Sequence, residues 1–268
     1  MKIYNPQQKD IVKCSYEITL ACNLRCSYCY NLDNLDNKKL YSPAIDDIIN
    51  KVNEANVDTF EFVGGEPLLV HDQVEYFIKN TNCRRYVVFT NLLFRKNKIE
   101  KIKNINCDFI CSWHDNDELF KENVVYLNKF KNVQVSIILD DINVAYNRVM
   151  FLKEHGIDYR IEILRENSVP IFHDFTNPKY NEIMQNDDTI VIFDDVEYNA
   201  VEIKKMNFLN ISKQYKTICQ LSTFSIQFDG TIIPECGYNG TIESLIPQMR
   251  LCKGFSCVCN IRNYKKCV

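Results

Sequence analysis

The sequence predicts an α/β fold: a partial (β/α)6 TIM-like barrel followed by a small cysteine-rich C-terminal module of β-hairpin and helix. Through about residue 187, short apolar runs alternate with amphipathic stretches of helical period, a pattern typical of repeated βα units around a parallel sheet. Six such units take up roughly 175 residues, too few for a closed eight-stranded barrel. The pattern then changes, so we expect a barrel domain at 1–187 and a second module at 188–268.

The barrel elements follow in order along the chain. The apolar runs predict strands over residues 14–20, 58–63, 86–90, 108–113, 133–139 and 158–164. The amphipathic stretches between them predict helices over residues 42–54, 70–79, 95–102, 116–129 and 141–154. We expect Ser42 to be the N-cap of the first helix with Pro43 at its first position, and Gly156 to end the last.

The second module is marked by a hairpin and by its cysteines. Residues 224–234 read as two short strands joined by a turn at Asp229-Gly230, after an apolar run at 190–193. Six of the thirteen cysteines fall in the last 50 residues. In a chain without a secretion signal, this density indicates a metal site or an iron-sulfur cluster.

Composition favours a cytoplasmic enzyme. The chain has 268 residues, 46% of them hydrophobic, and a net charge of -3, which gives a nucleic-acid partner no electrostatic support. Its first residues carry no apolar signal region, and no stretch of about 18 apolar residues exists that would suggest a membrane span.

The most informative motif is a run of three cysteines, Cys22, Cys26 and Cys29. Three thiolates can hold a [4Fe-4S] cluster and leave one iron without a protein ligand, open to a substrate or cofactor. A zinc knuckle or a set of buried thiols is the alternative. Zinc would need a fourth ligand close by, and the nearest histidine, His71, is far off in the sequence.

A second motif, Gly64-Gly65-Glu66-Pro67, follows an apolar run. Adjacent glycines let the backbone come close to a ligand, and Glu66 offers a carboxylate to an ammonium group. Alone, the motif also fits an ordinary turn. Its place at the end of the second expected strand, with the cysteine loop after the first, puts both loops on one rim of a parallel barrel.

Both motifs resemble those of radical S-adenosylmethionine (SAM) enzymes, as does the aromatic Tyr28 before the third cysteine. The resemblance implies that the open iron binds SAM, with residues 64–67 at its methionine end, and that the reduced cluster cleaves SAM to a 5′-deoxyadenosyl radical. It also implies the partial barrel. Weaker SAM-binding positions follow from their places on or at the ends of strands: Thr90, Asn91, Ser112 and Ser136. Each is open to the alternative of a capping or turn residue.

The tail resembles the twitch and SPASM extensions of the same enzymes, in which cysteines around a hairpin hold auxiliary [4Fe-4S] clusters. The full pattern has a CxxC and a CxxxC pair, and neither occurs here. Two clusters need eight ligands and the tail offers six cysteines, so the resemblance implies one auxiliary cluster. Its expected ligands are Cys219 and Cys236 with two of Cys252, Cys257 and Cys259. A zinc ribbon of the same cysteines is the alternative.

Substrate-side groups are expected to project from strand ends into the barrel. Candidates for proton transfer or charge pairing are Glu17, His114, Arg160 and Glu162. His114 leads because an imidazole exchanges a proton near neutral pH, although a structural histidine is the alternative. Strand alternation lets only one of Cys111 and Ser112 face inward, and we expect Cys111 to be a buried thiol.

The function that follows is abstraction of a hydrogen atom from an unactivated C–H bond, in oxidative modification of a peptide. The expected partners are that substrate and an external electron donor of flavodoxin or ferredoxin type. Dehydrogenation of a small metabolite such as an aminocyclitol is an alternative, because only 21 residues precede Cys22 and leave no room there for a leader-binding domain. A zinc-stabilised binding module without catalysis is the alternative from another class.

Overall fold

The computed structural model describes residues 12–29, 31–114 and 117–163, and shorter stretches beyond them: 165–166, 169–170, 176–184, 190–193, 196–199, 217–221, 223–234, 242–243, 245, 248–251 and 264–266. Its centre is an eight-stranded sheet in the order β13-β12-β1-β2-β3-β4-β5-β6, in which β12 is Thr223–Ile226 and β13 is Ile232–Pro234. The barrel strands are parallel neighbours in chain order: β1 (Lys13–Thr19), β2 (Thr59–Gly64), β3 (Arg85–Thr90), β4 (Asp108–Trp113), β5 (Val133–Leu139) and β6 (Asp158–Ile163).

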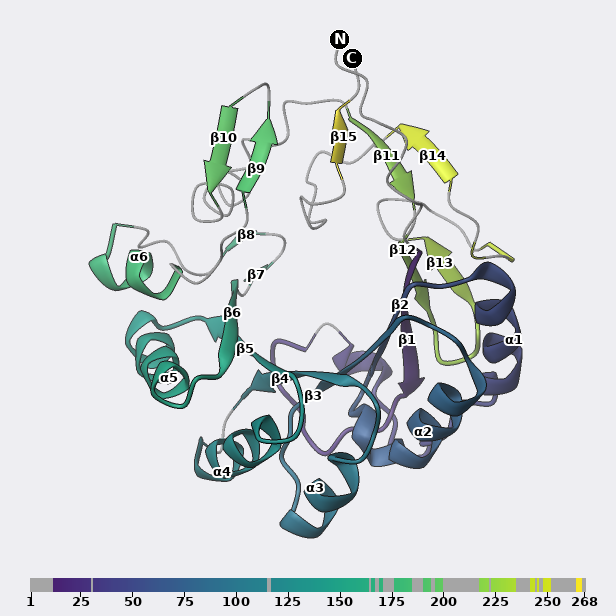
Figure 1. The fold of residues 1–268 in the computed structure, drawn as a ribbon, viewed down its shortest axis with the longest axis horizontal. Helices are drawn as coiled ribbons and strands as arrows, with labels where there is room; N and C mark the ends of the chain where they lie inside the picture. The colour runs from purple at the N-terminus through teal and green to yellow at the C-terminus, as the bar shows by residue number, and fades with distance from the viewer. Residues whose placement is uncertain are drawn as a thin grey trace.

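Helices connect these strands and cover the convex face of the curved sheet, which stays open on one side (Figure 1). They are α1 (Ile45–Ala55), α2 (His71–Asn80), α3 (Lys96–Ile102), α4 (Asp117–Asn128) and α5 (Ile142–Glu154). The α/β fold class and the partial TIM-like barrel, with its six expected strands, are therefore confirmed. Each predicted strand is found within one residue of its expected bounds.

Strand alternation divides the side chains between two faces. On β1, Cys14, Tyr16 and Ile18 are fully buried under the helices, whereas Ser15 on the other face is half-buried. The helix side of the sheet holds stacked aromatic rings, such as Phe60 and Phe77 with centroids 4.3 Å apart. The other, concave face of these strands carries polar side chains such as Ser15, Glu17 and Glu61.

The first helix begins three residues later than the sequence predicts, with Ala44 rather than Ser42 as its N-cap. The Ser42 hydroxyl is buried and makes other bonds. It accepts from the Tyr16 hydroxyl at 2.5 Å and from the Ala44 amide at 3.2 Å, and donates to the Phe228 carbonyl at 2.6 Å. Ser42 therefore joins β1 to the segment after β12 instead of capping a helix.

The helices predicted at 70–79 and 141–154 are present with different starts. A 3-10 turn, η2 (Pro67–Val70), precedes α2, because the Glu66 carboxylate caps the Leu68 amide. The N-cap of α5 is Asp141, whose side chain accepts from Asn143 at 2.8 Å and from the amide after it at 3.0 Å. The Asp140 side chain does not cap the helix: its one described hydrogen bond is accepted from the Asp141 amide.

The predicted hairpin at 224–234 forms, with strands β12 (Thr223–Ile226) and β13 (Ile232–Pro234). Its turn uses Gly230 at φ +88°, and the Asp229 side chain accepts from the Thr231 amide at 2.9 Å. Strand β12 pairs in parallel with β1, so the hairpin extends the barrel sheet. The division of the chain at residue 188 stays a prediction.

Short elements complete the described part of the chain. They are η1 (Leu32–Asn34), β7 (Arg165–Glu166), β8 (Val169–Pro170), α6 (Pro178–Met184), β9 (Ile190–Phe193), β10 (Val196–Asn199), β11 (Thr217–Leu221), β14 (Gln248–Leu251) and β15 (Tyr264–Lys266). Strand β11 lies between β14 and β15 in an antiparallel sheet. Within the described residues, no helix has the length and apolar character needed to cross a bilayer.

Candidate functional site

The loop after β1 carries the three cysteines of the first motif. Cys22, Cys26 and Cys29 are half-buried cysteines, and a turn closes between the last two through a bond from the Cys29 amide to the Cys26 carbonyl at 3.1 Å. The Leu24 amide donates to the sulfur of Cys22 at 3.4 Å. The loop thus presents three sulfurs, one of which already receives a backbone hydrogen bond.

The second motif is bonded directly to this loop. The Gly65 amide donates to the Thr19 carbonyl and the Glu66 amide to the Ala21 carbonyl, each at 2.8 Å. A Cβ at Gly64 would lie 2.3 Å from the Thr19 oxygen, and one at Gly65 would lie 2.0 Å from the Ala21 oxygen. The close approach that requires glycine is therefore between the two motifs themselves.

Glu66 is buried and bound on several sides. Its carboxylate accepts from the Leu68 amide at 3.0 Å, the Thr90 hydroxyl at 2.8 Å and the Asn91 amide at 2.7 Å. Burial raises its pKa to about 7, against the lowering effect of these donors. Glu66 thus ties the motif to the end of β3. Its binding to an ammonium group stays a prediction.

The end of β3 in turn holds the cysteine loop. Asn91 donates from Nδ2 to the side-chain oxygen of Asn23 at 2.7 Å, and Asn23 donates to the Leu93 carbonyl at 3.2 Å. Leu92 between them has φ +55°, and Asn123 of α4 secures it by donating to its carbonyl at 2.9 Å. The expected role of Thr90 and Asn91 in SAM binding stays a prediction, whereas their role in joining the loops is observed.

His114, at the end of β4, lies beside the cysteine loop. Its Nδ1 is 2.6 Å from the Tyr28 hydroxyl and 3.7 Å from the sulfur of Cys26, and the two rings stack with centroids 5.9 Å apart. Arg148 of α5 donates to the carbonyls of Trp113 and His114 at 3.1 and 2.8 Å. Sequence reasoning missed Arg148, because an arginine on an amphipathic helix gives no signal of such a bond.

The remaining nominated serines lie in one row across the sheet. Ser112 of β4 is the register partner of Ser136 of β5, which pairs with Arg160 of β6. Ser112 is half-buried and Cys111 is fully buried in the helix-side core, so Cys111 is a buried thiol as expected. Burial raises the pKa of the Cys111 thiol.

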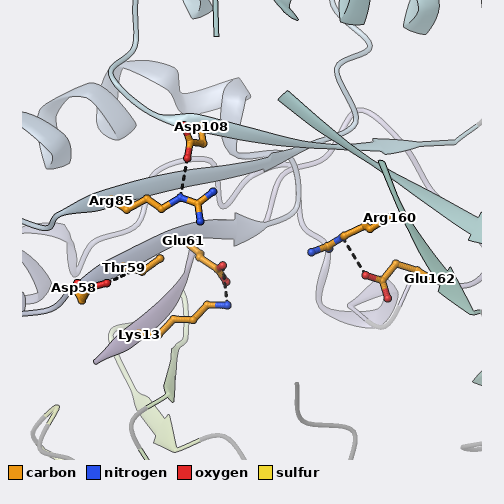
Figure 2. Close-up of polar contacts among 8 residues, drawn as sticks. All are labelled: Lys13, Asp58, Thr59, Glu61, Arg85, Asp108, Arg160 and Glu162. Carbon is orange, nitrogen blue, oxygen red and sulfur yellow. Dashed lines mark hydrogen bonds and ion pairs between the residues drawn. The ribbon is translucent and has the colours of Figure 1, made fainter. Parts of the chain in front are cut away.

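Ion pairs line the concave face of the sheet (Figure 2): Lys13 with Glu61 at 2.8 Å, Arg85 with Asp108 at 2.7 Å, and Arg160 with Glu162 at 3.0 Å. The Arg160 guanidinium also lies over the Phe89 ring, 5.4 Å from its centroid. Glu162 is about half exposed. Its proposed role in proton transfer stays a prediction.

Glu17 is buried on β1, an inner strand of the sheet. It accepts from Asn31 at 3.1 Å and from the Phe228 amide. Burial raises its pKa, and the neighbouring charge of Asp229 adds to the rise. The structure therefore places Glu17, His114 and Glu162 against different partners, on β1, β4 and β6, rather than in one cluster.

The expected ligands of an auxiliary cluster lie largely outside the described residues. The backbone of Cys219 belongs to β11, where its register partners are Arg250 and Tyr264. The side chain of Cys219 is outside the description, as are Cys236, Cys252, Cys257 and Cys259. The auxiliary cluster stays a prediction.

Comparison with known protein families identifies the family to which both motifs belong. Residues 16–176 match the Radical SAM superfamily, which is more than half of the chain and includes both motifs. The chain belongs to the radical SAM superfamily. Membership in this superfamily implies SAM and a [4Fe-4S] cluster as cofactors.

Two relatives show how far the likeness extends. An uncharacterized protein of Methanocaldococcus jannaschii is 36% identical over 101 residues, which are 34% of each chain. A cysteine-type anaerobic sulfatase-maturating enzyme of Clostridium novyi is 27% identical over 208 residues, 73% of this chain and 44% of that enzyme. The match thus spans less than half the length of either relative.

The fold is also similar to that of a solved crystal structure. Streptococcus suis SuiB, in its crystal structure with the precursor peptide SuiA, superposes with a TM-score of 0.57 and 15% identity, over 87% of this chain and 62% of that one. At this identity the likeness concerns the fold alone.

The residues of the cysteine loop fit the implied cluster. Burial raises the pKa of Cys22, and the negative charges of Glu66, Cys26 and Cys29 raise it further, a crowding that bound iron would relieve. Among the described side chains, no three His, Cys, Asp or Glu converge on a single metal ion.

Proposed function

We propose that the protein is a radical SAM oxidoreductase that removes a hydrogen atom from an unactivated C–H bond of a peptide. When bound, the cluster and SAM supply an electron and the 5′-deoxyadenosyl radical. The observation that carries the proposal is the direct joining of the two motifs, through the bonds from Gly65 to Thr19 and from Glu66 to Ala21. These bonds hold the cysteine loop against the segment assigned to SAM.

The surrounding residues have roles that follow from their positions. Glu66, Thr90 and Asn91 fix the distance between the two loops through bonds of 2.7 to 2.8 Å. His114, at the end of β4, contacts Tyr28 and lies 3.7 Å from the sulfur of Cys26. Ser112 and Ser136 offer hydroxyls on the next two strands, where the proposed SAM site would extend.

A peptide substrate is supported by one relative. The Clostridium novyi enzyme matures a sulfatase, which is itself a polypeptide, and it is similar to this chain over 73% of the chain's residues. We propose the same class of substrate here. Oxidation requires that a second electron leave the substrate, and we propose that an auxiliary cluster on the tail cysteines accepts it.

The electron that starts the reaction is proposed to come from a flavodoxin or ferredoxin. Either protein would deliver one electron at a time, which is what reductive cleavage of SAM consumes.

The proposal is tested with the full chain after anaerobic reconstitution. Iron analysis should give about eight irons per chain if an auxiliary cluster is present and about four if it is absent. Incubation with SAM, dithionite and peptides encoded beside the gene should give a peptide lighter by two hydrogen atoms. Zinc in place of iron, with no cleavage of SAM, would contradict the proposal and support the binding-module alternative.

A further inference from the structure

An open polar cavity of about 480 Å³ lies on the concave face of the sheet, between β1, β2, β12 and η1. The carboxylates of Glu17 and Glu61 line it together with three carboxamides, Asn31, Asn34 and Gln227. Two serines and Val63 complete the lining. Such a cavity is shaped for a polar group rather than for an apolar side chain.

The cavity adjoins the cysteine loop. Asn31 and Asn34 follow Cys29 by two and five residues, and Val63 directly precedes Gly64 of the second motif. A substrate group held here would therefore bring the rest of the substrate toward the rim on which both motifs lie. The cavity therefore lies on the other side of the sheet from the helix-side core.

The charges on its wall do not balance. Lys13 forms an ion pair with Glu61 at 2.8 Å (Figure 2). Glu17 is the other carboxylate on the wall. The described partners of Glu17 are the neutral donors Asn31 and the Phe228 amide, and the nearby Asp229 adds a second negative charge. Two carboxylates against one ammonium give the wall a net charge of -1 before Asp229 is counted.

We propose that this cavity binds a positively charged nitrogen of the substrate, an amine or a guanidinium, with Glu17 as its counter-ion and the three carboxamides as hydrogen-bond partners. The inference rests on the proposed function, since it identifies the substrate class of the same barrel. A cation here compensates a carboxylate that is only 7% exposed, which a neutral hydroxyl does not do. A lysine or arginine side chain of a peptide meets the requirement.

The test measures binding and does not depend on turnover. The reconstituted full chain with SAM is titrated with Nα-acetyl-lysine methylamide and with its uncharged norleucine analogue, followed by saturation-transfer NMR. We expect the lysine probe to bind and the norleucine probe to bind at least about tenfold more weakly, the discrimination expected of one charge-assisted contact. Glu17→Gln should abolish the difference, and Gln227→Glu should increase it.

Controls keep the outcome clear. Glu54→Gln, on the exposed face of α1, makes the same chemical change away from the cavity and should leave the discrimination intact. Thermal melts establish that each variant folds. Equal binding of both probes by the wild type, or an unchanged preference in both cavity variants, would overturn the inference. Failure of the proposed function is detected separately: the wild-type protein would then form no 5′-deoxyadenosine.

Discussion

The Nδ2 group of Asn91 donates to the side-chain oxygen of Asn23 at 2.7 Å and so joins the end of β3 to the cysteine loop. The two residues are 68 positions apart, and one of them stands directly after Cys22. The Asn91 amide also binds Glu66. A chain of hydrogen bonds therefore runs from the second motif through β3 to the first.

Replacement of Asn23 by alanine removes two of the bonds that hold the cysteine loop, to Asn91 and to the Leu93 carbonyl. We expect a cost of about 1 kcal/mol per bond in the free energy of unfolding and faster loss of iron to a chelator. The decay of cluster absorbance under bathophenanthroline measures this. Asn50→Ala, exposed on α1, is the control, and equal rates in both variants would contradict the assigned role of Asn23.

Gly65→Ala should strongly destabilise the folded protein. The new Cβ would lie 2.0 Å from the Ala21 carbonyl oxygen, and a backbone atom cannot turn away as a side chain can. We expect destabilisation of about 3 kcal/mol or more and poor iron incorporation.

The matched control is Gly156→Ala, where φ is +62° but nothing lies within 4 Å of the new Cβ. Only backbone strain of about 1 kcal/mol is expected there. Chemical unfolding of both variants makes the comparison. A Gly65 variant no less stable than the Gly156 variant would show that the contact between the motifs is looser than described.

The barrel was predictable because its signals are local. The alternation of apolar runs and helical stretches gives each of β1 to β6 within one residue, and the two rim motifs are contiguous in sequence. Helix starts were less accurate, because a buried hydroxyl such as Ser42 can serve a distant partner, here the Phe228 carbonyl, instead of the nearest helix.

What escaped prediction depends on contacts between distant segments. The donors to the Glu66 carboxylate, in η2 and at the end of β3, had no local signal in the sequence. The binding of Glu66 to an ammonium group stays a prediction. The contacts of His114 with Tyr28 and Cys26 join residues 86 and 88 positions apart and had no local signal in the sequence. The expected role of His114 toward a substrate stays a prediction. The pairing of β12 with β1 joins residues more than 200 apart and has no local signal.

Glu66 should make stability depend on pH. Its pKa is about 7 in the folded protein against an ordinary value of 4.5. Between these values the folded state holds more protons than the unfolded chain, so stability falls as pH rises. The full difference is about 3 kcal/mol, at about 1.4 kcal/mol per pKa unit.

Glu66→Gln should remove this component. Free energies of unfolding at pH 5 and pH 7.5 for wild type and variant isolate it, because other groups contribute equally to both. Glu54→Gln serves as the control for removal of a carboxylate. A wild type whose stability rises with pH relative to the Glu66 variant would contradict a raised pKa.

His114→Phe should alter the electronic environment of Cys26. Nδ1 lies 3.7 Å from that sulfur. In the tautomer that carries its proton on Nδ1, the imidazole donates toward a cluster thiolate and stabilises the reduced state, so its loss should make the reduction potential more negative. Redox titration of reconstituted protein measures the change. His155→Phe, at the exposed end of α5, is the control. An equal reduction potential in both variants would show that His114 does not influence the cluster.

The most direct test of the central claim is the amount of 5′-deoxyadenosine formed from SAM and dithionite by wild-type protein, Cys26→Ala and Cys83→Ala. Cys83 is also a half-buried free thiol, but it lies outside the cysteine loop. The account predicts 5′-deoxyadenosine from the wild type and from Cys83→Ala, and none from Cys26→Ala. Wild-type protein that forms no more 5′-deoxyadenosine than Cys26→Ala would contradict it.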